Sequence, residues 1–323
     1  MRFIDHAILA PASRATAPLG AILVLALASY ACGGSDEGTG AQTAGGNLSG
    51  EIRGDGSSTV FPITEAVVEE FGKINDVKIS IGISGTGGGF ERFCNKETDF
   101  NDASRPIKEA EKDACADKGV EYVEFQVAYN GLSLVVNPSS DFVDCLKVEE
   151  LRRLWEPSST INNWRQVRDG FPDRKLTLYG PGEDSGTFDY FTQVIVGTEG
   201  SSRADYTASE DDNLLVQGVS GDQGALGYFG YAYYAENIDK LRLLSVDPGN
   251  GSCVSPTPET ILSGEYTPLS RPLYVYFTKE ALERPEVGEF VRFYLAEGAA
   301  LAEEVGYVAA PAEIYEEGLA KLR

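Results

Sequence analysis

The chain has 323 residues, 42% of them apolar, which is enough for about two domains at roughly 150 residues each. Acidic residues outnumber basic ones by 50 to 27, so the formal net charge is −23. A surface this acidic repels a phosphodiester backbone, which excludes nucleic acid as the main partner. The only histidine, His6, lies in a segment that we expect to be removed. Histidine-based catalytic triads and zinc hydrolases are therefore excluded for the mature protein.

The N-terminus has the features of an export signal, which we expect over residues 1–31. Two arginines precede an apolar run at 19–28, and this run is too short to span a bilayer. The run ends in Ser-Tyr-Ala followed by Cys32, which resembles a bacterial lipoprotein signal, in which the cysteine becomes the lipidated first residue. We expect lipidation of Cys32 and a flexible tether over 32–50. A plain cleavable signal that leaves Cys32 unmodified is the alternative.

Four further cysteines predict two disulfides, because an even number in an exported chain indicates pairing. Three connectivities are open. The pairs Cys94–Cys115 and Cys145–Cys253 are favoured, since the first closes a short local loop and the second joins two distant segments. A four-cysteine metal site is the alternative, but no C-x-x-C spacing supports it.

Three times along the body of the chain, a strand-like run leads into a polar loop and then an amphipathic stretch. The first of these stretches has Pro62 in its first turn, followed by apolar residues at four-residue spacing. The strand candidates are 51–54, 77–83 and 176–179, and the loops are 55–59, 84–89 and 180–187. This alternation predicts an α/β fold.

The rest of the chain is expected to supply the scaffold. Buried strands are predicted at 122–127, 132–137, 225–229 and 273–277, and helices at 148–155 and 285–299. The aromatic cluster at 228–234 suggests sugar stacking, but a core strand followed by a helix is the favoured interpretation.

The three polar loops are candidates for anion binding. A helix N-terminus has unpaired backbone N–H groups and a partial positive charge, and hydroxyl side chains add neutral donors. Three such loops together predict a site for a tetrahedral oxyanion, although each loop alone is also explained by plain helix capping. The glycines at 85–89 lack the P-loop lysine and the dinucleotide fingerprint. Ser185 has no histidine and no Ser-x-x-Lys motif to activate it as a nucleophile.

Four motifs carry a family resemblance. In chain order they are Gly-Ser-Ser-Thr-Val-Phe-Pro at 56–62, Ser-Gly-Thr-Gly-Gly-Gly-Phe at 84–90, Asp-Ala-Ser-Arg-Pro-Ile at 102–107 and Asp-Ser-Gly-Thr-Phe at 184–188. With these motifs the chain beyond the tether resembles PstS-type phosphate-binding proteins, the extracytoplasmic substrate-binding component of the phosphate ABC transporter. The resemblance implies a type II periplasmic-binding-protein fold, in which two lobes, each a mixed sheet flanked by helices, join at a hinge. We expect lobe 1 over 51–127 plus 248–323, and lobe 2 over 128–247.

The resemblance also implies a phosphate site. By position, the expected binding residues are Ser58, Thr59, Thr86, Gly87, Ser104, Arg105, Ser185, Gly186 and Thr187. The family's arginine stands four residues before the serine of the Ser-Gly-Thr motif, where this chain has Pro181. Arg105 is the expected substitute, because its planar fork fits two phosphate oxygens. A surface ion pair is the alternative role for Arg105.

A carboxylate is also implied, because HPO₄²⁻ carries a proton that sulfate lacks, and an acceptor carboxylate discriminates between them. The family's aspartate sits in an Ala-Ser-Asp motif, but this chain reads Ala-Ser-Arg at 103–105. Either Asp102 or Asp184 is expected to take the role. Asp102 is alternatively a turn residue, and Asp184 a helix cap.

The function that the resemblance implies is a non-enzymatic phosphate receptor. Its expected partners are inorganic phosphate and the permease subunits of the ABC transporter, and it touches the membrane only through a lipid anchor. We expect a monomer without cofactor or metal, in the periplasm or on the outer face of the cell membrane. A receptor for sulfate, molybdate or arsenate is the first alternative, and a phosphate-ester hydrolase is the second.

Overall fold

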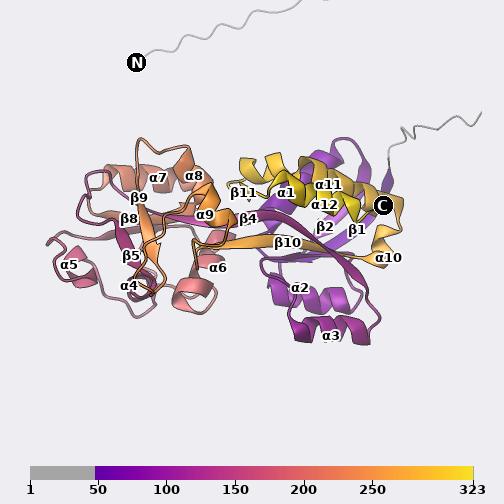
Figure 1. Cartoon of the computed structure of the whole chain (residues 1–323), viewed down its shortest axis with the longest axis horizontal. Coiled ribbons are helices and arrows are strands. Elements are labelled where there is room, and N and C mark those ends of the chain that lie inside the picture. Colours follow the sequence, from indigo (N-terminus) through magenta and orange to yellow (C-terminus); the bar gives the residue numbers. More distant parts are fainter. Residues whose placement is uncertain (1–47, 323) are drawn as a thin grey trace, which may run out of the picture. The chain divides into compact units, whose positions relative to one another are not determined.

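The computed structural model describes residues 48–322, so the expected signal and Cys32 lie outside the described residues. Strands alternate with helices along the chain, as the sequence predicts (Figure 1). The main strand order is β2-β1-β3-β10-β4-β8-β6-β7. Between residues 48 and 322, no helix combines the length and the apolar character needed to cross a membrane.

The first lobe is built on a mixed sheet. Its strands are β1 (Ser49–Gly56), β2 (Asp76–Ile81), β3 (Phe100–Ala103), the first part of β4 (Tyr122–Val136), β10 (Ser270–Thr278) and β11 (Val308–Ala309). β1 pairs in parallel with β2 and β3, whereas β10 runs antiparallel to β3 and β4. β1 begins at Ser49, which pairs with Asp76. The expected tether therefore ends two residues early, because its last two residues already belong to a strand.

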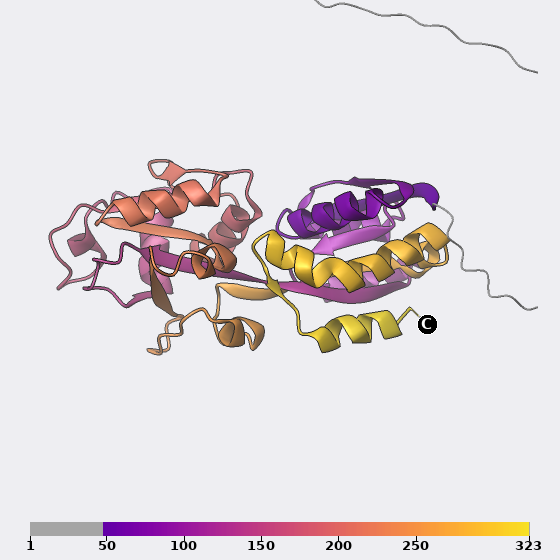
Figure 2. The ribbon, with the colours of Figure 1, turned by 90° about the horizontal axis from the view of Figure 1, so that it is seen from above.

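Helices cover both faces of this sheet. They are α1 (Phe61–Gly72), α2 (Gly85–Cys94), α3 (Glu109–Asp117), α10 (Lys279–Leu282), α11 (Pro285–Glu304) and α12 (Ala312–Ala320). α1, α11 and α12 lie on one face, and α2 and α3 lie on the other (Figures 1 and 2). The side chains of β10 alternate accordingly, since Val275 and Phe277 pack under α11 while Tyr276 packs under α2.

The predicted first helix is confirmed as α1. Pro62 occupies its first turn, where a missing N–H costs nothing. Ile63, Val67 and Phe71 are each fully buried, as their four-residue spacing predicts. This burial fixes the end of the preceding loop, 57–60, against the sheet.

The second lobe repeats the layered plan. Its strands are the second part of β4, β5 (Cys145–Lys147), β6 (Thr177–Gly180), β7 (Thr207–Ala208), β8 (Ala225–Gly230) and β9 (Arg242–Asp247). Its helices are α4 (Val148–Trp155), α5 (Trp164–Val167), α6 (Gly186–Phe191), the π-helical turn η1 (Thr192–Val196), α7 (Asp212–Gly221), α8 (Tyr231–Ala235) and α9 (Pro258–Leu262). The aromatic cluster at 228–234 forms the end of β8 and most of α8, so the strand-and-helix interpretation is confirmed.

Two long strands connect the lobes (Figure 1). In β4, Ala128 belongs to the first core and Leu132 to the second, so the chain crosses between them. The sequence predicts two strands here, at 122–127 and 132–137, but they form one continuous strand, β4. The chain returns to the first lobe later than the expected boundary at residue 248. Ile261 and Leu269 still pack in the second core, because their apolar side chains fill space beside β4, and the chain returns within β10.

Both favoured disulfides are confirmed. Cys94–Cys115 joins α2 to α3 within the first lobe. Cys145–Cys253 joins β5 to the segment that follows β9, across a sequence separation of 108 residues. The second bridge thus fixes a segment that has little regular structure of its own against the second-lobe sheet.

Candidate functional site

Two of the three expected loops line a cavity of about 310 Å³, which we call the hydroxyl pocket. Serine and threonine side chains make up much of its wall, and charged side chains complete it. The lining residues are Ser57, Ser58, Thr59, Ser84, Gly85, Thr86, Gly87, Ser104, Arg105, Lys108, Asp189, Tyr190, Gln193, Glu199 and Arg271. Six of the nine expected binding residues therefore lie around one cavity.

The first loop is held in place by backbone contacts. Gly56 has φ +139°, in the left-handed region that favours glycine, and an added Cβ would lie 2.2 Å from the Asp102 carbonyl oxygen. The next residue, Ser57, donates its N–H to that carbonyl oxygen at 3.0 Å. Tyr307 donates its hydroxyl to the Thr59 carbonyl oxygen at 2.7 Å. These contacts present Ser58 and Thr59 to the pocket from fixed backbone.

The glycine-rich segment differs from the expectation. It was expected to form a loop at 84–89, but Gly85 to Gly89 form the first half of α2, with Ser84 at the N-cap. Close packing explains Gly89, since a Cβ there would meet the Asn101 side chain at 1.9 Å, and Gly85 has φ +74°, which favours glycine. The first turn of α2 therefore brings its unpaired N–H groups and the positive end of its dipole to the pocket.

Buried Asp55 ties the first two loops together. Its carboxylate accepts from the backbone N–H of Gly56 at 2.7 Å and of Ser84 at 3.0 Å. It also accepts from the Ser84 hydroxyl and pairs with Arg92, whose Nη1 lies 3.0 Å away. A carboxylate with four donors is well compensated for its burial, so Asp55 is a positioning residue for both loops.

Arg105 lines the pocket but already has a partner. Its two Nη atoms donate to the two carboxylate oxygens of Glu111, at 2.8 and 2.6 Å. Against the effect of burial, the hydrogen bonds from Arg105 and from the Lys108 backbone hold the pKa of Glu111 below its usual value. In this structure Arg105 therefore forms an ion pair with Glu111, and both side chains are partly buried. Thr86 and Ser104, whose hydroxyl oxygens lie 3.0 Å apart, complete this side of the pocket.

Arg271 is the pocket arginine that the sequence analysis missed. It lies in β10, and its Nη2 donates to the Thr59 hydroxyl oxygen at 3.1 Å while Nη1 donates to Gln193 at 3.3 Å. Its Nε atom is buried and has no hydrogen-bond partner among the described residues. Desolvation lowers the pKa of Arg271 to about 10, so the group stays charged at neutral pH. The available signal in the sequence was a charged residue two positions before the buried run at 273–277.

The third loop lines a second cavity, of about 670 Å³, which we call the acidic groove. Its lining residues are Ser58, Phe61, Pro62, Ile83, Asn130, Glu183, Asp184, Ser185, Gly186, Thr187, Asp189, Glu210, Asp212, Gly230, Tyr233, Glu304, Val305, Gly306 and Tyr307. Ser185, Gly186 and Thr187 therefore lie beside the hydroxyl pocket and not around it. Ser185 caps α6 by accepting from the Thr187 N–H at 3.2 Å.

Ser58 and Asp189 line both cavities and connect the two lobes. The Ser58 hydroxyl donates to the Asp189 carboxylate at 2.5 Å. Beside this bond, Thr59 donates its hydroxyl to the Gly186 carbonyl oxygen at 3.1 Å. A Cβ on Gly186 would lie 2.6 Å from Thr59 Cα, so glycine is required for this approach. Asp189 is a second residue that the sequence analysis missed, although it lies one helical turn after Ser185.

The two expected proton acceptors do not line the hydroxyl pocket. Asp102 is fully buried in the first lobe, where its carboxylate accepts from Thr64 at 2.9 Å. Burial raises its pKa well above the usual value, the Thr64 bond opposes this, and the nearby charge of Asp55 adds to it. Asp184 is exposed and lines the acidic groove. Among the carboxylates, Asp189 and Glu199 line the pocket instead, so this placement disfavours the expected roles of Asp102 and Asp184.

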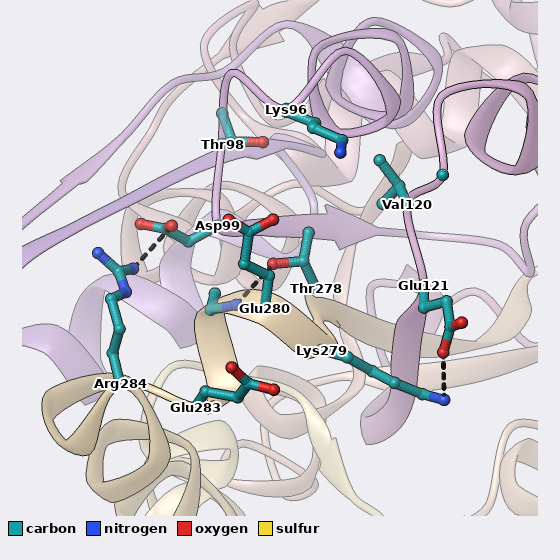
Figure 3. Close-up of a pocket in the computed structure, with 12 residues that line it drawn as sticks. Lys96, Thr98, Asp99, Val120, Glu121, Thr278, Lys279, Glu280, Glu283 and Arg284 are labelled. Atoms are coloured by element: carbon teal, nitrogen blue, oxygen red, sulfur yellow. Dashed lines mark hydrogen bonds and ion pairs between the residues drawn. The ribbon is translucent and has the colours of Figure 1, made fainter.

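A third cavity, of about 660 Å³, lies near α10, away from both lobe-connecting contacts. Figure 3 shows that charged pairs line it, namely Lys279 with Glu121 and Arg284 with Asp99. Opposite charges are already matched there, so this cavity is a weaker candidate for a charged ligand than the hydroxyl pocket.

Two α/β lobes connected by long strands, with a polar pocket where the lobes touch, define a two-lobed binding protein. The family model described as PBP superfamily domain matches residues 41–297, and the chain belongs to this superfamily.

Relatives and solved structures agree with this family. Protein SphX of Synechocystis sp. is 51% identical over 268 residues, which cover 82% of this chain and 80% of that protein. Phosphate-binding protein PstS of Staphylococcus saprophyticus is 41% identical over 309 residues, covering 95% and 92%. The crystal structure of a possible phosphate binding protein from Planctomyces limnophilus is 52% identical with a TM-score of 0.81, covering 85% of this chain and 99% of that one. PstS from Borrelia burgdorferi is 26% identical with a TM-score of 0.58, covering 81% and 99%.

Proposed function

We propose that this protein binds inorganic phosphate in the hydroxyl pocket and delivers it to a membrane ABC permease. Relatives named for phosphate binding support this function over nearly the whole chain. The observation that carries the proposal is Arg271, a charged group whose buried Nε lacks a partner in the described residues, inside a pocket of neutral hydroxyl donors. A buried unpaired donor is costly until an acceptor arrives, and a phosphate oxygen is such an acceptor.

The remaining groups divide into neutral donors and fixed dipoles. The hydroxyls of Thr86 and Ser104 and the first turn of α2 at Gly87 can donate to phosphate oxygens. The hydroxyls of Ser58 and Thr59 can do so when they give up their present acceptors, Asp189 and the Gly186 carbonyl oxygen. Neutral donors stabilise an anion without adding a charge that would have to be desolvated. Ser185 and Thr187 reach the phosphate only when the second lobe moves toward the first. We infer that β4 and the start of β10 act as the hinge for that movement. β4 has residues in both lobe cores, and β10 begins directly after Leu269 of the second core and continues into the first.

Asp189 is proposed as the acceptor for the phosphate proton. Its carboxylate lines the pocket and in this structure accepts from Ser58. A bound HPO₄²⁻ would donate a hydrogen bond from its O–H group to this carboxylate, whereas sulfate has no such group and would be repelled. The side chain that connects the lobes would thus also select the ligand.

Titration calorimetry with one anion at a time tests the function. Protein stripped of bound phosphate should bind phosphate in preference to sulfate, molybdate and arsenate. A receptor for another oxyanion predicts that one of the others binds more tightly, and that result would overturn phosphate as the ligand. A phosphate-ester hydrolase predicts product from a chromogenic phosphate ester, whereas the proposed receptor shows binding without turnover.

We further propose that the protein is exported and anchored by a lipid on Cys32, and that it acts as a monomer. The export signal and the cysteine stand in the order of a bacterial lipoprotein signal.

A further inference from the structure

The acidic groove adjoins the hydroxyl pocket, shares Ser58 and Asp189 with it, and carries a cluster of negative charge. Six carboxylates line it, and no lysine or arginine is among its lining residues. They are Glu183, Asp184, Asp189, Glu210, Asp212 and Glu304. Of these six, only Asp189 has a role in the proposed phosphate site, so the other five charges have no function in phosphate binding.

These six carboxylates form no salt bridge within the described part of the chain, although Asp189 accepts a hydrogen bond from Ser58 and Glu210 accepts one from the Asp184 N–H. None of them lies within 4.0 Å of a described basic nitrogen. Desolvation, followed by the neighbouring charges of Asp211 and Glu210, raises the pKa of Asp212 to about 7. Like charges held this close destabilise one another, and a bound cation would relieve that repulsion.

A second, independent observation points to a ligand. Asn130 in β4 lines the groove, is only 2% exposed, and has a side-chain Nδ2 without a partner in the described residues. A buried amide donor of this kind costs free energy unless an acceptor oxygen meets it. The occupant should therefore offer positive charge to the carboxylates and also an acceptor oxygen to Asn130.

Those two requirements favour one chemistry. Within residues 48–322, no group of three or more acidic, cysteine or histidine side chains is arranged to hold a metal ion. A spread of carboxylates around about 670 Å³ instead fits an extended ligand with separated charges. A peptide backbone supplies carbonyl oxygens, and lysine or arginine side chains supply the cations. We propose that the acidic groove binds a lysine- or arginine-bearing peptide segment of a partner protein.

The position of Asp189 couples this groove to the phosphate pocket, a step that rests on the proposed function. Asp189 lines both cavities, and its carboxylate holds the Ser58 hydroxyl at 2.5 Å. A lysine or arginine that reaches Asp189 competes with Ser58 for the same oxygens. Binding of the basic peptide then weakens a contact between the lobes. By linkage, bound peptide lowers the affinity for phosphate, and bound phosphate lowers the affinity for the peptide by the same factor.

The test uses the protein without its first 31 residues and two synthetic peptides. Calorimetry compares acetyl-Ala-Lys-Ala-Arg-Ala-amide with acetyl-Ala-Gln-Ala-Gln-Ala-amide, in 50 mM salt. The basic peptide should bind at least fivefold more tightly. The double variant Glu210→Gln/Asp212→Asn should lower the affinity for the basic peptide at least fivefold. The matched control, Glu280→Gln/Glu283→Gln, removes two charges beside the third cavity (Figure 3). It should change the affinity for the basic peptide less than twofold.

Asn130→Leu, checked for folding by circular dichroism, should weaken binding of the basic peptide. It should leave binding of spermidine unchanged, because spermidine has no carbonyl oxygen for Asn130 to contact. Saturating basic peptide should weaken phosphate binding at least threefold. Equal binding of both peptides, or an unchanged affinity in the Glu210/Asp212 variant, would overturn the proposal. Spermidine binding as tightly as the peptide would overturn the peptide as the ligand. If phosphate fails to bind while the basic peptide binds as expected, the proposed function fails and the groove assignment remains.

Discussion

The guanidinium of Arg271 lies over the ring of Tyr190, with its Cζ atom 3.7 Å from the ring centroid. The ring is itself held, because the Tyr190 hydroxyl donates to the Pro268 carbonyl oxygen at 2.6 Å. A cation over an aromatic face is stabilised and its plane is oriented. Residues from β10 and α6, which belong to different parts of the sequence, thus place one fork-shaped donor in the hydroxyl pocket.

Arg271→Ala should weaken phosphate binding by about 2–5 kcal/mol, because it leaves a dianion without its charged partner. Arg271→Lys keeps the charge but loses the planar fork, and should still cost at least tenfold, about 1.4 kcal/mol. Arg105→Ala is the comparison, since Glu111 already pairs with Arg105, and its effect should be the smaller one. Calorimetry on the three variants measures this. A larger loss for Arg105→Ala would transfer the main charged role to Arg105.

Asp189→Asn should bring the affinities for phosphate and sulfate closer together, because an amide donates where a carboxylate only accepts and repels. Competition calorimetry with the two anions measures the ratio. Asp184→Asn is a matched control, since Asp184 lines only the acidic groove, and it should leave the ratio within about twofold of the wild type. An unchanged ratio in Asp189→Asn would remove the proton-acceptor role from this residue and direct attention to Glu199.

Asp102→Asn should flatten the dependence of stability on pH. Burial raises the folded-state pKa of Asp102 above 3.8, the usual value. Below about pH 3.8, the usual pKa, the Asp102 carboxyl is protonated in both the folded and the unfolded state. As the pH rises, the unfolded state ionises first, so the free energy of unfolding falls by up to about 1.4 kcal/mol per pH unit, until the folded-state group ionises.

Urea unfolding of wild type and Asp102→Asn between pH 4 and pH 8 measures this difference. The amide mimics the neutral acid, so the variant should lack the decline that belongs to Asp102. Parallel profiles for the two proteins would show that Asp102 ionises normally in the folded state. Phosphate affinity is expected to stay within about twofold in this variant, because the side chain is buried away from the pocket.

Removing the long-range disulfide should destabilise the protein more than removing the local one. The Cys145–Cys253 bridge spans 108 residues and the Cys94–Cys115 bridge spans 21. In the chain-entropy model, loops of these lengths contribute about 5 and about 3 kcal/mol. Urea midpoints of the two Cys-to-Ala pairs test the order. Non-reducing peptide mapping of the wild type should recover the same two pairs, and a Cys94–Cys145 peptide would contradict them.

Cys32→Ala should release the protein from membranes, because a lipid on this cysteine is proposed as the anchor. Cell fractionation followed by blotting measures the distribution. Cys94→Ala, which breaks a disulfide without touching the anchor, is the control and should stay with the membrane fraction. A Cys32→Ala protein that remains membrane-bound would contradict lipid anchoring.

Local patterns in the sequence determined much of the architecture. The helix at 148–155 is predicted to the residue, and the spacing of Ile63, Val67 and Phe71 predicts the buried face of α1. Both disulfide pairs were favoured from spacing alone. The helices and strands depend on periodicity among residues that are close in the chain. The disulfides depend on loop closure, and four cysteines allow only three pairings.

The tertiary structure alone decided which charged groups meet the pocket. Arg271 reaches Thr59 across 212 positions, and Asp189 reaches Ser58 across 131. No local pattern marks such pairs, because the register of β10 against β4 and the contact between lobes bring them together. Asp102 shows the converse, since its motif position suggested the pocket but its side chain turns into the lobe core. A motif fixes the backbone segment, whereas packing decides the direction of each side chain. The polar loops could therefore be predicted, whereas the charged side chains that line the pocket with them could not.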